Sequence, residues 1–309
     1  MDNHNLIIGT RGSELALWQT NFVKGQLESK HPSLKVTVKI IKTTGDELLD
    51  IPLSKIGDKG LFTKQLEQSL LSGEIDIAVH SLKDLQTLQP DGLTIAAVLP
   101  RETPNDVLLS KTSTSIDDLP LGAEVLTGSL RRTSQLIGRR PDLKIVDIRG
   151  NLPTRLNRFH SSTCEAMILA YAGLHRLGFD SQITQLIPFD VMLPAVGQGA
   201  VAIESRSDDT ATLDLVRKLD HIETKVCVMA ERSFLRKLEG GCQVSIGSLA
   251  TLDNGIITLS GVVGDLSGKV IRDTITGQAE NAEELGIELA ERIIAAGGDK
   301  LIARVRGGR

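Results

Sequence analysis

Aromatic residues are scarce in this chain. Phe, Trp and Tyr make up 3% of the 309 residues, with one Trp and one Tyr. Proteins that bind single-stranded nucleic acid stack bases on aromatic side chains, so a stacking platform is not expected. Positive charge is not in excess either, because the formal net charge is −4. We therefore expect no nucleic-acid partner and no electrostatic binding to a membrane surface.

Long hydrophobic runs and paired cysteines are also lacking. No apolar stretch approaches the roughly 20 residues that cross a bilayer, and residues 1–6 lack the basic and apolar pattern of a signal peptide. The three cysteines, Cys164, Cys227 and Cys242, are odd in number and widely spaced. This argues against a disulfide framework and favours a reducing compartment. We expect a cytoplasmic protein with no membrane partner, and the scattered histidines predict no metal site.

Strands and helices alternate over the first two thirds of the chain. The expected strands are 6–10, 34–42, 75–80, 93–99, 124–127, 144–148 and 166–170. The expected helices between them are 14–29, 61–71, 131–138 and 153–159. This alternation predicts an α/β fold with mixed, mainly parallel sheets covered by helices. A faint echo between residues 70–78 and 161–169 indicates two similar lobes.

The pattern changes near residue 220. A helix over 223–238, short strands with hairpin turns over 245–277 and a helix over 283–296 predict a small α+β domain. Segments 99–104 and 193–199, marked by proline and glycine, are candidate crossovers. The expected domains are residues 1–99 with 195–219, residues 100–194, and residues 220–309. A cleft between the two lobes is the expected ligand site.

Six arginines follow expected strand ends on one predicted rim. They are Arg11, Arg131, Arg132, Arg149, Arg155 and Arg176. Ser129 precedes a predicted helix, where a hydroxyl caps the first turn and backbone N–H groups attract anions. Most loop arginines are merely solvated, but six at corresponding positions predict a ligand with many carboxylates or phosphates. Arginine matches planar carboxylates better than lysine does.

Two side chains suggest chemistry. Asp84 follows the buried strand at 75–79, where its carboxylate could stabilise positive charge or pass a proton. The alternative is a surface ion pair with Lys83. His80 is expected to hydrogen-bond within the fold rather than act as a base. Cys242 follows two glycines that allow a sharp turn and a protruding sulfur, as suits a covalent attachment, although a buried thiol in a capping turn is the alternative.

Seven motifs along the chain carry a family resemblance: residues 10–19, 59–62, 76–84, 128–132, 149–151, 193–200 and 238–243. In these motifs the chain resembles the porphobilinogen deaminase family, also called hydroxymethylbilane synthases, from end to end. The resemblance implies a transferase of tetrapyrrole and heme biosynthesis that joins four porphobilinogen molecules head to tail and releases ammonia at each addition. It also implies a covalent dipyrromethane cofactor as primer, two lobes like those of periplasmic binding proteins, a third domain, and a monomer.

The resemblance also implies roles for individual residues. Asp84 matches the catalytic carboxylate, and Cys242 matches the cysteine that holds the cofactor through a thioether. The remaining cofactor positions are Lys83, Ser129, Arg131 and Arg132, together with Asp84. The substrate positions are Arg11, Ser13, Gln19, Arg149, Arg155, Arg176, Gln198, Lys59 and Phe62, of which Lys59 and Phe62 bound a loop expected to move over the cleft. The chain departs from the family at Gln86 and Ser245, where proline is usual; both positions lie in loops beside the Asp84 and Cys242 motifs.

Two other functions are compatible with part of this pattern. A two-lobed anion-binding protein or sensor would need the lobes and the arginines. Asp84 and Cys242 favour the enzyme, because simple binding needs neither of them. A thiol-dependent hydrolase is less favoured, because no histidine or asparagine partner pattern accompanies Cys242.

Overall fold

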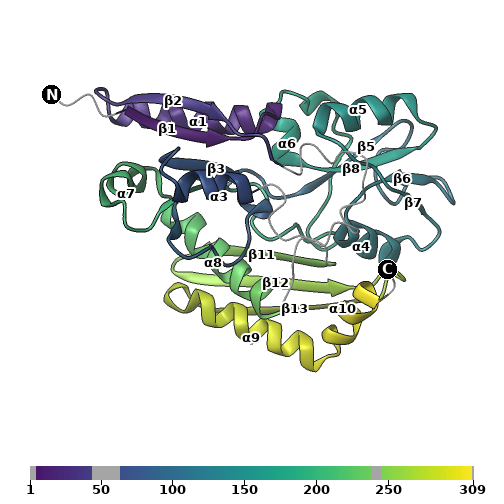
Figure 1. The fold of residues 1–309 in the computed structure, drawn as a ribbon. Helices are drawn as coiled ribbons and strands as arrows, with labels where there is room; N and C mark the ends of the chain where they lie inside the picture. Colours follow the sequence, from purple (N-terminus) through teal and green to yellow (C-terminus); the bar gives the residue numbers. More distant parts are fainter. Residues whose placement is uncertain (1–4, 44–62, 239–244, 308–309) are drawn as a thin grey trace. The chain divides into compact units, whose positions relative to one another are not determined.

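The computed structural model of the chain describes residues 5–43, 63–238 and 245–307 (Figure 1). The described chain forms two compact units. The first takes the residues up to Glu102 together with Ala200–Lys225, and the second takes Thr103–Gly199 and the residues from Val226 onward. The chain therefore leaves the first unit and returns to it. The proposed boundaries of three separate domains stay a prediction.

The first unit is built on a five-stranded sheet in the order β2-β1-β3-β10-β4. Its strands are β1 (Asn5–Thr10), β2 (Lys35–Ile40), β3 (Ile77–Ser81), β4 (Leu93–Val98) and β10 (Val201–Arg206). Its helices are α1 (Glu14–Lys30), α3 (Lys64–Leu71), α7 (Thr210–Val216) and the short η2 (Leu82–Asp84) and η4 (Arg217–Leu219). Only β10 runs against the other four strands, so the sheet is mixed and mainly parallel, as predicted.

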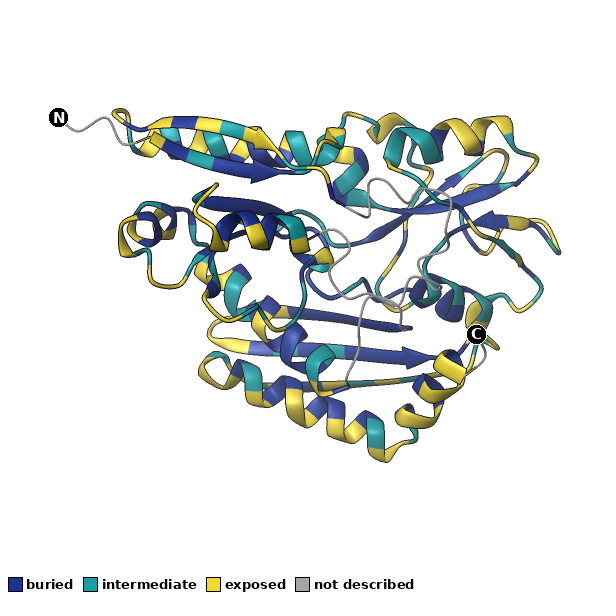
Figure 2. Ribbon diagram, viewed as in Figure 1, coloured by how far each residue is buried: buried dark blue, intermediate teal, exposed yellow. Residues whose placement is uncertain are grey.

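Helices cover both faces of this sheet, which is why β3 is apolar on consecutive residues. Ile77 and Val79 belong to the cluster that includes Val23 and Leu27 of α1. Ala78, whose side chain points to the opposite face, packs with residues of α3. Figure 2 shows the resulting buried stripe along β3. His80, two residues after Ala78, therefore lies on the face covered by α3.

The second unit contains a sheet of the same topology, in the order β7-β6-β8-β5-β9. Its strands are β5 (Asp106–Ser110), β6 (Glu124–Leu126), β7 (Lys144–Val146), β8 (Ala166–Ala170) and β9 (Gln185–Leu186). Its helices are α4 (Leu130–Arg139), α5 (Leu152–Ser161), α6 (Tyr171–Arg176) and the short η3 (Asp180–Gln182). Here β5 is the reversed strand. The two sheets thus share strand order and direction, which confirms the two similar lobes.

The second unit also includes the C-terminal α+β region. Helix α8 (Ile222–Lys237) is followed by a meander of β11 (Ile246–Asp253), β12 (Ile256–Gly264) and β13 (Val270–Gln278). The short η5 (Ala279–Asn281), α9 (Ala282–Ala295) and α10 (Gly298–Gly307) complete the region. The β11–β12 hairpin turns at Asn254 and Gly255, both with positive φ, as the hairpin signal predicts. Phe234 of α8 lies in the core beneath this sheet.

Several elements differ from the sequence-based expectation. The reversed strands β5 and β10 and the helices α7 and α10 were not predicted, because short apolar runs without alternation do not distinguish strand from coil. Strand β8 ends at Ala170, as expected, but helix α6 begins at once at Tyr171. Arg176 consequently lies at the last turn of a helix. Cys164 and Cys227 are both buried, as expected of packing residues. Among the described helices, none is long and apolar enough to cross a bilayer.

Candidate active site

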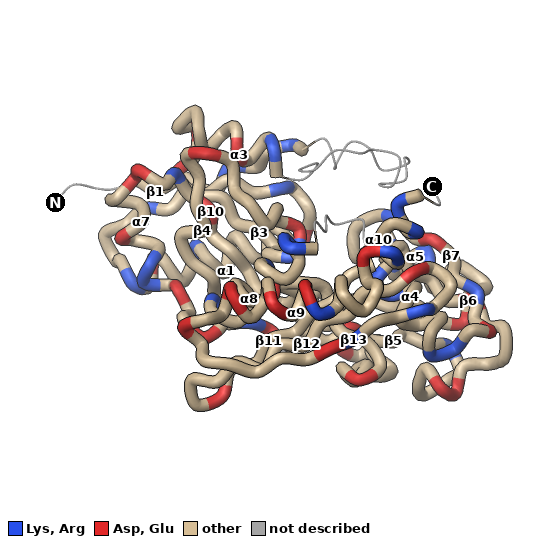
Figure 3. The backbone as a smooth tube through the Cα atoms, turned by 90° about the horizontal axis from the view of Figure 1, so that it is seen from below, with Lys and Arg blue, Asp and Glu red and all other residues tan. Residues whose placement is uncertain are grey.

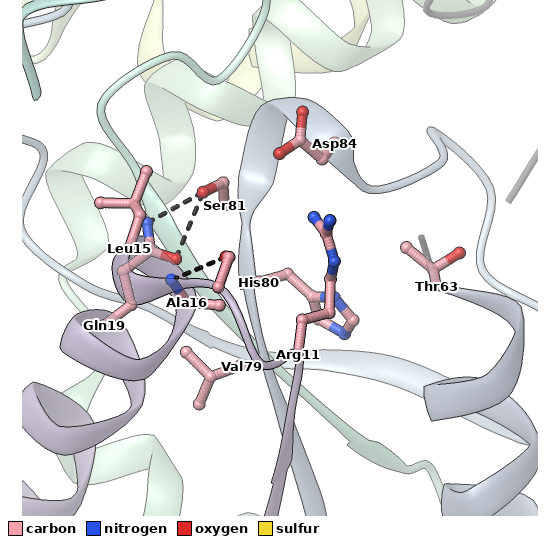
Figure 4. A pocket seen from close by; sticks show the side chains of 10 residues that line it. Arg11, Leu15, Ala16, Gln19, Thr63, Val79, His80, Ser81 and Asp84 are labelled. Atoms are coloured by element: carbon pink, nitrogen blue, oxygen red, sulfur yellow. Dashed lines mark hydrogen bonds between the residues drawn. The ribbon is translucent and has the colours of Figure 1, made fainter. Parts of the chain in front are cut away.

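A pocket in the first unit opens where β1 and β3 end. Its lining comprises Arg11, Ser13, Leu15, Ala16, Gln19, Thr63, Val79, His80, Ser81 and Asp84 (Figure 4). Strands β1 and β3 are parallel neighbours, so the residues after their carboxyl ends meet at one edge of the sheet. The fold therefore brings together four residues predicted from sequence to belong to the site: Arg11, Ser13, Gln19 and Asp84.

Asp84 is held at the pocket by a single turn of 3₁₀ helix. In η2 and the residue after it, Leu82 and Leu85 are buried, whereas Asp84 between them is exposed. The two leucines anchor the turn and leave the carboxylate outside the core. In Figure 4 the guanidinium of Arg11 extends into the pocket toward the Asp84 carboxylate. The Asp84 carboxylate and the Arg11 guanidinium, which follow the ends of two different strands, thus share one pocket.

Ser13 and Gln19 have structural partners at this edge. The Ser13 hydroxyl accepts a hydrogen bond from Ala16 N at 3.4 Å and so caps α1. The Gln19 side chain is buried, and its Nε2 donates to Ser81 Oγ at 2.9 Å. These contacts fix the wall of the pocket by tying the first turns of α1 to the end of β3.

A buried cluster lies behind this pocket: His80 hydrogen-bonds within the fold, as predicted, but the two glutamates beside it were not predicted. His80 Nε2 lies 2.9 Å from Glu204 Oε2, and Glu67 of α3 is also buried. Burial raises the pKa of the Glu67 carboxyl and Glu204 raises it further, while Thr63 and His80 lower it. The available signal was the position of Glu204, a charged residue that directly follows the apolar residues 201–203 of β10.

In the second unit, Arg131 and Arg132 converge on a single carboxylate, that of Asp106. Arg131 Nη1 donates to Asp106 Oδ2 at 2.6 Å, and Arg132 Nη2 donates to Asp106 Oδ1 at 2.7 Å. Asp106 is fully buried. Burial raises its pKa, but the two guanidiniums outweigh this effect and hold the pKa well below its usual range. Asp106 begins the unpredicted strand β5, so the sequence analysis did not single it out.

Gln198 joins the same cluster, which carries an excess of positive charge. Its Nε2 donates to Asp106 Oδ1 at 3.0 Å and to Pro104 O at 2.7 Å. Ser129 caps α4 by accepting from Arg132 N at 3.5 Å, as predicted. Two guanidiniums face one carboxylate here, and both are almost fully buried. Four of the predicted positions, Ser129, Arg131, Arg132 and Gln198, are thus close together.

The other predicted arginines of the second unit each have a local partner. Arg149 Nε lies 3.1 Å from Asp147 Oδ2. Arg155 Nε donates to Gly150 O at 2.8 Å, and Arg176 Nη2 donates to Gly199 O at 2.7 Å. Figure 3 shows acidic and basic residues interspersed along the chain. The arginines are therefore distinguished by the partners of each side chain and not by a large patch of one charge.

The remaining predicted positions have different outcomes. Lys83 lies in η2, next to Asp84. Lys59, Phe62 and Cys242 lie outside the described residues. Within the described part of the chain, no group of three or more His, Cys, Asp or Glu side chains could hold a metal ion. The cleft expected between the lobes stays a prediction.

Ser245, one of the two positions where the sequence resemblance implied a proline, has a clear partner. Its hydroxyl hydrogen-bonds the hydroxyl of Ser134 on α4, and both residues are buried. Gln86, the other departure, accepts a hydrogen bond at its backbone carbonyl from Gln89 Nε2 at 2.8 Å. The serine therefore adds a polar contact that proline could not make.

Comparison with known proteins identifies related sequences along nearly the whole chain. The family model described as "Porphobilinogen deaminase, dipyromethane cofactor binding domain" matches residues 6–214. The model described as "Porphobilinogen deaminase, C-terminal domain" matches residues 225–295. Together they span both units.

Individual relatives agree with the family models. The porphobilinogen deaminase of Chlorobium phaeobacteroides (strain BS1) is 52% identical over 306 residues, which cover 97% of this chain and 98% of that protein. That of Chloroherpeton thalassium (strain ATCC 35110 / GB-78) is 51% identical over 307 residues, with the same coverage. Among solved structures, the methionine binding protein MetQ has a TM-score of 0.43 at 12% identity, covering 71% of this chain and 90% of that one. A similarity this low adds nothing to the topology described above.

Proposed function

Because the chain belongs to the porphobilinogen deaminase family, we propose that it is a hydroxymethylbilane synthase, a transferase of tetrapyrrole biosynthesis. It joins four porphobilinogen molecules head to tail and releases ammonia at each addition. The observation that carries the proposal is the pocket in which Arg11 and Asp84 lie together at the ends of β1 and β3. This reaction needs a cation that binds the carboxylates of the substrate and a carboxylate that stabilises a developing positive charge. Arg11 and Asp84 are residues of these two kinds.

Substrate binding requires cations, because each pyrrole unit carries an acetate and a propionate. Guanidiniums hold planar carboxylates with two parallel hydrogen bonds, so arginine is the residue suited to this ligand. We assign this role to Arg11, Arg149, Arg155 and Arg176, with Ser13, Gln19, Gln198, Lys59 and Phe62 as further substrate positions. Arg155 and Arg176 are each held by a backbone carbonyl. A backbone carbonyl that accepts such a hydrogen bond helps to orient the guanidinium.

The residues of the second unit fit a dipyrromethane cofactor. The group carries several carboxylates, and the cluster of Arg131 and Arg132 on Asp106 has one positive charge in excess. An anion beside it would balance that charge. When bound, the cofactor supplies a covalently held primer for the growing chain. Cys242 is the proposed attachment residue, and Lys83, Ser129 and Asp84 are the other proposed contacts.

Asp84 is the proposed catalytic residue. Loss of ammonia from the aminomethyl group of porphobilinogen leaves a cation, and a carboxylate fixed nearby stabilises that cation more than it stabilises the substrate. The same carboxylate can accept a hydrogen bond from the pyrrole N–H and so orient the ring. The buried Leu82 and Leu85 hold Asp84 in place before the substrate arrives.

Replacement of the Asp84 carboxylate tests this assignment. Asp84→Asn keeps the size of the side chain and removes its charge, so we expect hydroxymethylbilane formation to fall by about 100-fold or more while the protein melts at an unchanged temperature. Asp91→Asn, an exposed aspartate of the same unit, is the matched control and should retain full turnover. Undiminished turnover in Asp84→Asn would remove Asp84 from the reaction.

The setting of the enzyme is also part of the proposal. Porphobilinogen is its small-molecule partner, and the chain acts as a monomer in the cytoplasm without a nucleic-acid or membrane partner. The net charge of −4, the low aromatic content and the odd number of cysteines support this setting. Sedimentation of the purified protein tests the monomer.

A further inference from the structure

His80 and Glu204 form a buried pair because of the register of two strands. In the antiparallel pairing of β3 with β10, Ala202 lies opposite His80, and Glu204 is two residues further along β10 on the same face. Diagonal neighbours of this kind are within reach of long side chains. His80 Nε2 lies 2.9 Å from Glu204 Oε2, and the two side chains are 4% and 0% exposed. The pair is thus built into the sheet itself.

Glu67 adds a second carboxylate to the same buried region. It lies on α3, the helix that covers this face of the sheet, and it is 6% exposed. Within the described residues, neither Glu67 Oε1 nor Glu204 Oε1 has a hydrogen-bond partner. Unpartnered buried polar atoms are costly, and apolar residues would stabilise such a core at least as well. Because two buried carboxyl groups lower the stability of this core, we infer that Glu67 and Glu204 have a role in the reaction.

The cluster reaches the active-site pocket through His80. This residue lines the pocket together with Arg11 and Asp84, and Thr63, which precedes Glu67 by one helical turn, lines it as well. Nε2 is occupied by the Glu204 carboxylate, so Nδ1 is the ring nitrogen that this contact does not engage. A histidine whose one nitrogen donates to a carboxylate presents the other nitrogen as a proton acceptor.

We propose that His80 accepts the proton that each condensation releases, with Glu204 as the positioning residue that fixes its tautomer; this rests on the proposed function. The aminomethyl group of porphobilinogen reacts as its ammonium form, so its C–N bond breaks and ammonia leaves with the bonding electron pair. The pyrrole ring at the end of the growing oligopyrrole then forms a C–C bond to the resulting cation, and the C–H bond at the attacking carbon of that ring breaks. The proton moves to His80 Nδ1 and is passed on to the ammonia, which departs as ammonium. Charge and atoms balance without any further reactant.

Charged groups from several elements surround this histidine and set the direction of its pH dependence. Glu204 on β10 and Glu67 on α3 lie on its buried side, while Arg11, Lys83 and Asp84 belong to the segments that follow β1 and β3. Proton acceptance requires the neutral ring, so turnover falls on the acid side as the ring becomes protonated. The Glu204 carboxylate, 2.9 Å from Nε2, fixes the ring and its tautomer, so its removal should disturb proton acceptance and the acid limb that reports it.

Two charge-removing variants test the pair through the pH profile of kcat and KM. We expect Glu204→Gln to lower kcat by about 100-fold with KM changed less than threefold, and to change the acid limb of the kcat profile. His80→Gln should abolish that limb. Glu28→Gln, a half-exposed glutamate on α1, is the matched control and should keep the wild-type profile. If both variants keep the wild-type shape of the kcat–pH profile, whether their rates are normal or uniformly reduced, the proposal is contradicted. A purely structural role would lower the rate equally at every pH and leave the acid limb unchanged.

A measurement on the unaltered protein keeps the test decisive if a variant does not fold. Nitrogen chemical shifts of histidine-labelled wild-type protein report the protonation of each ring, and the His80 signal is assigned by its loss in His80→Gln or by its coupling to neighbouring protons. If His80 is the acceptor, its ring must change protonation in step with the acid limb of the kcat profile. A ring that keeps one protonation state across that limb would overturn the proposal. A wild-type protein that makes no hydroxymethylbilane would instead refute the proposed function.

Discussion

The Asp106 carboxylate is the partner of two guanidiniums that the sequence points to for ligand binding. Arg131 and Arg132 were recognised from their position after a strand, but their partner lies 25 and 26 residues earlier, at the start of a reversed strand. No local pattern connects the two segments, because β5 and α4 meet only when the sheet forms. The sequence thus predicted the cations of the cluster and could not predict the anion that holds them.

Substitution of Asp106 should be strongly destabilising in a pH-dependent way. Asp106→Asn leaves two buried guanidiniums without their carboxylate, and we expect a loss of about 3–5 kcal/mol in the free energy of unfolding at pH 7. The folded-state pKa of Asp106 is lowered, so its contribution is present above the unfolded-state value of about 4 and is lost as pH falls through the folded-state value. The difference between wild type and variant should therefore be full at neutral pH and shrink in acid.

Urea unfolding at pH 7 and in acid measures this difference. Asp117→Asn is the control, because Asp117 also pairs with an arginine, Arg139, but both side chains are more than half exposed. Exposed pairs contribute little, so its cost should stay within about 1 kcal/mol. Equal costs for the two variants would show that burial of the Asp106 cluster is unimportant.

At the level of single elements, glycine permits the close approach of two helices in the C-terminal region. A Cβ at Gly286 of α9 would lie 1.9 Å from Ser233 Oγ and 2.3 Å from Ala230 O, both on α8. The Ser233 hydroxyl also donates to Glu283 O of α9 at 2.9 Å. Helix α9 was predicted from its apolar periodicity, but this contact was not, because the pattern gives the buried face and not the distance to its neighbour.

Gly286→Ala should lower stability because the two helix backbones must separate. We expect a loss of about 1–3 kcal/mol, as for other overpacked sites. Gly25→Ala in α1 is the matched control, because no atom lies within 4 Å of the added Cβ. That variant should gain about 0.5–1 kcal/mol from better helix propensity. Calorimetric melting curves of the two variants should shift in opposite directions, and a shift of the same sign would contradict this account.

At the scale of the whole molecule, the repeated lobe was the part that sequence could predict. The echo between residues 70–78 and 161–169 corresponds to the entry into β3 and β8, which occupy equivalent places in the two sheets. The reversed strand in each sheet was not foreseen. In the first sheet it is β10, which comes from residues 201–206, far along the chain from its neighbours. Long-range pairing of this kind has no local sequence signal.

Within the second unit, Arg272 links the C-terminal sheet to the lobe. From β13 it donates to Phe189 O at 3.0 Å, to Asp190 O at 2.8 Å and to Gln135 Oε1 at 3.2 Å. Burial lowers the pKa of its guanidinium and the nearby Asp190 raises it. These contacts lie between parts of one unit that are separated in sequence, so they should contribute to its cooperative unfolding.

Arg272→Met tests that contribution, because it keeps much of the apolar stem and removes the donors. We expect the unfolding free energy of this unit to fall by about 1.5–3 kcal/mol, as for hydrogen bonds to a charged group. Arg217→Met removes an exposed arginine paired with Asp214 and should have almost no effect. An unchanged melting transition in Arg272→Met would mean that the sheet and the lobe are held together by apolar packing alone.

The central claim is that this chain is a hydroxymethylbilane synthase primed by a dipyrromethane on Cys242, and the intact mass of the purified protein tests it most directly. The mass is measured under denaturing conditions, before and after incubation with porphobilinogen, with Cys242→Ser as the control. The account predicts an added mass equal to two linked pyrrole units in the wild type and none in the variant. A wild-type mass that remains that of the bare chain after incubation would contradict it.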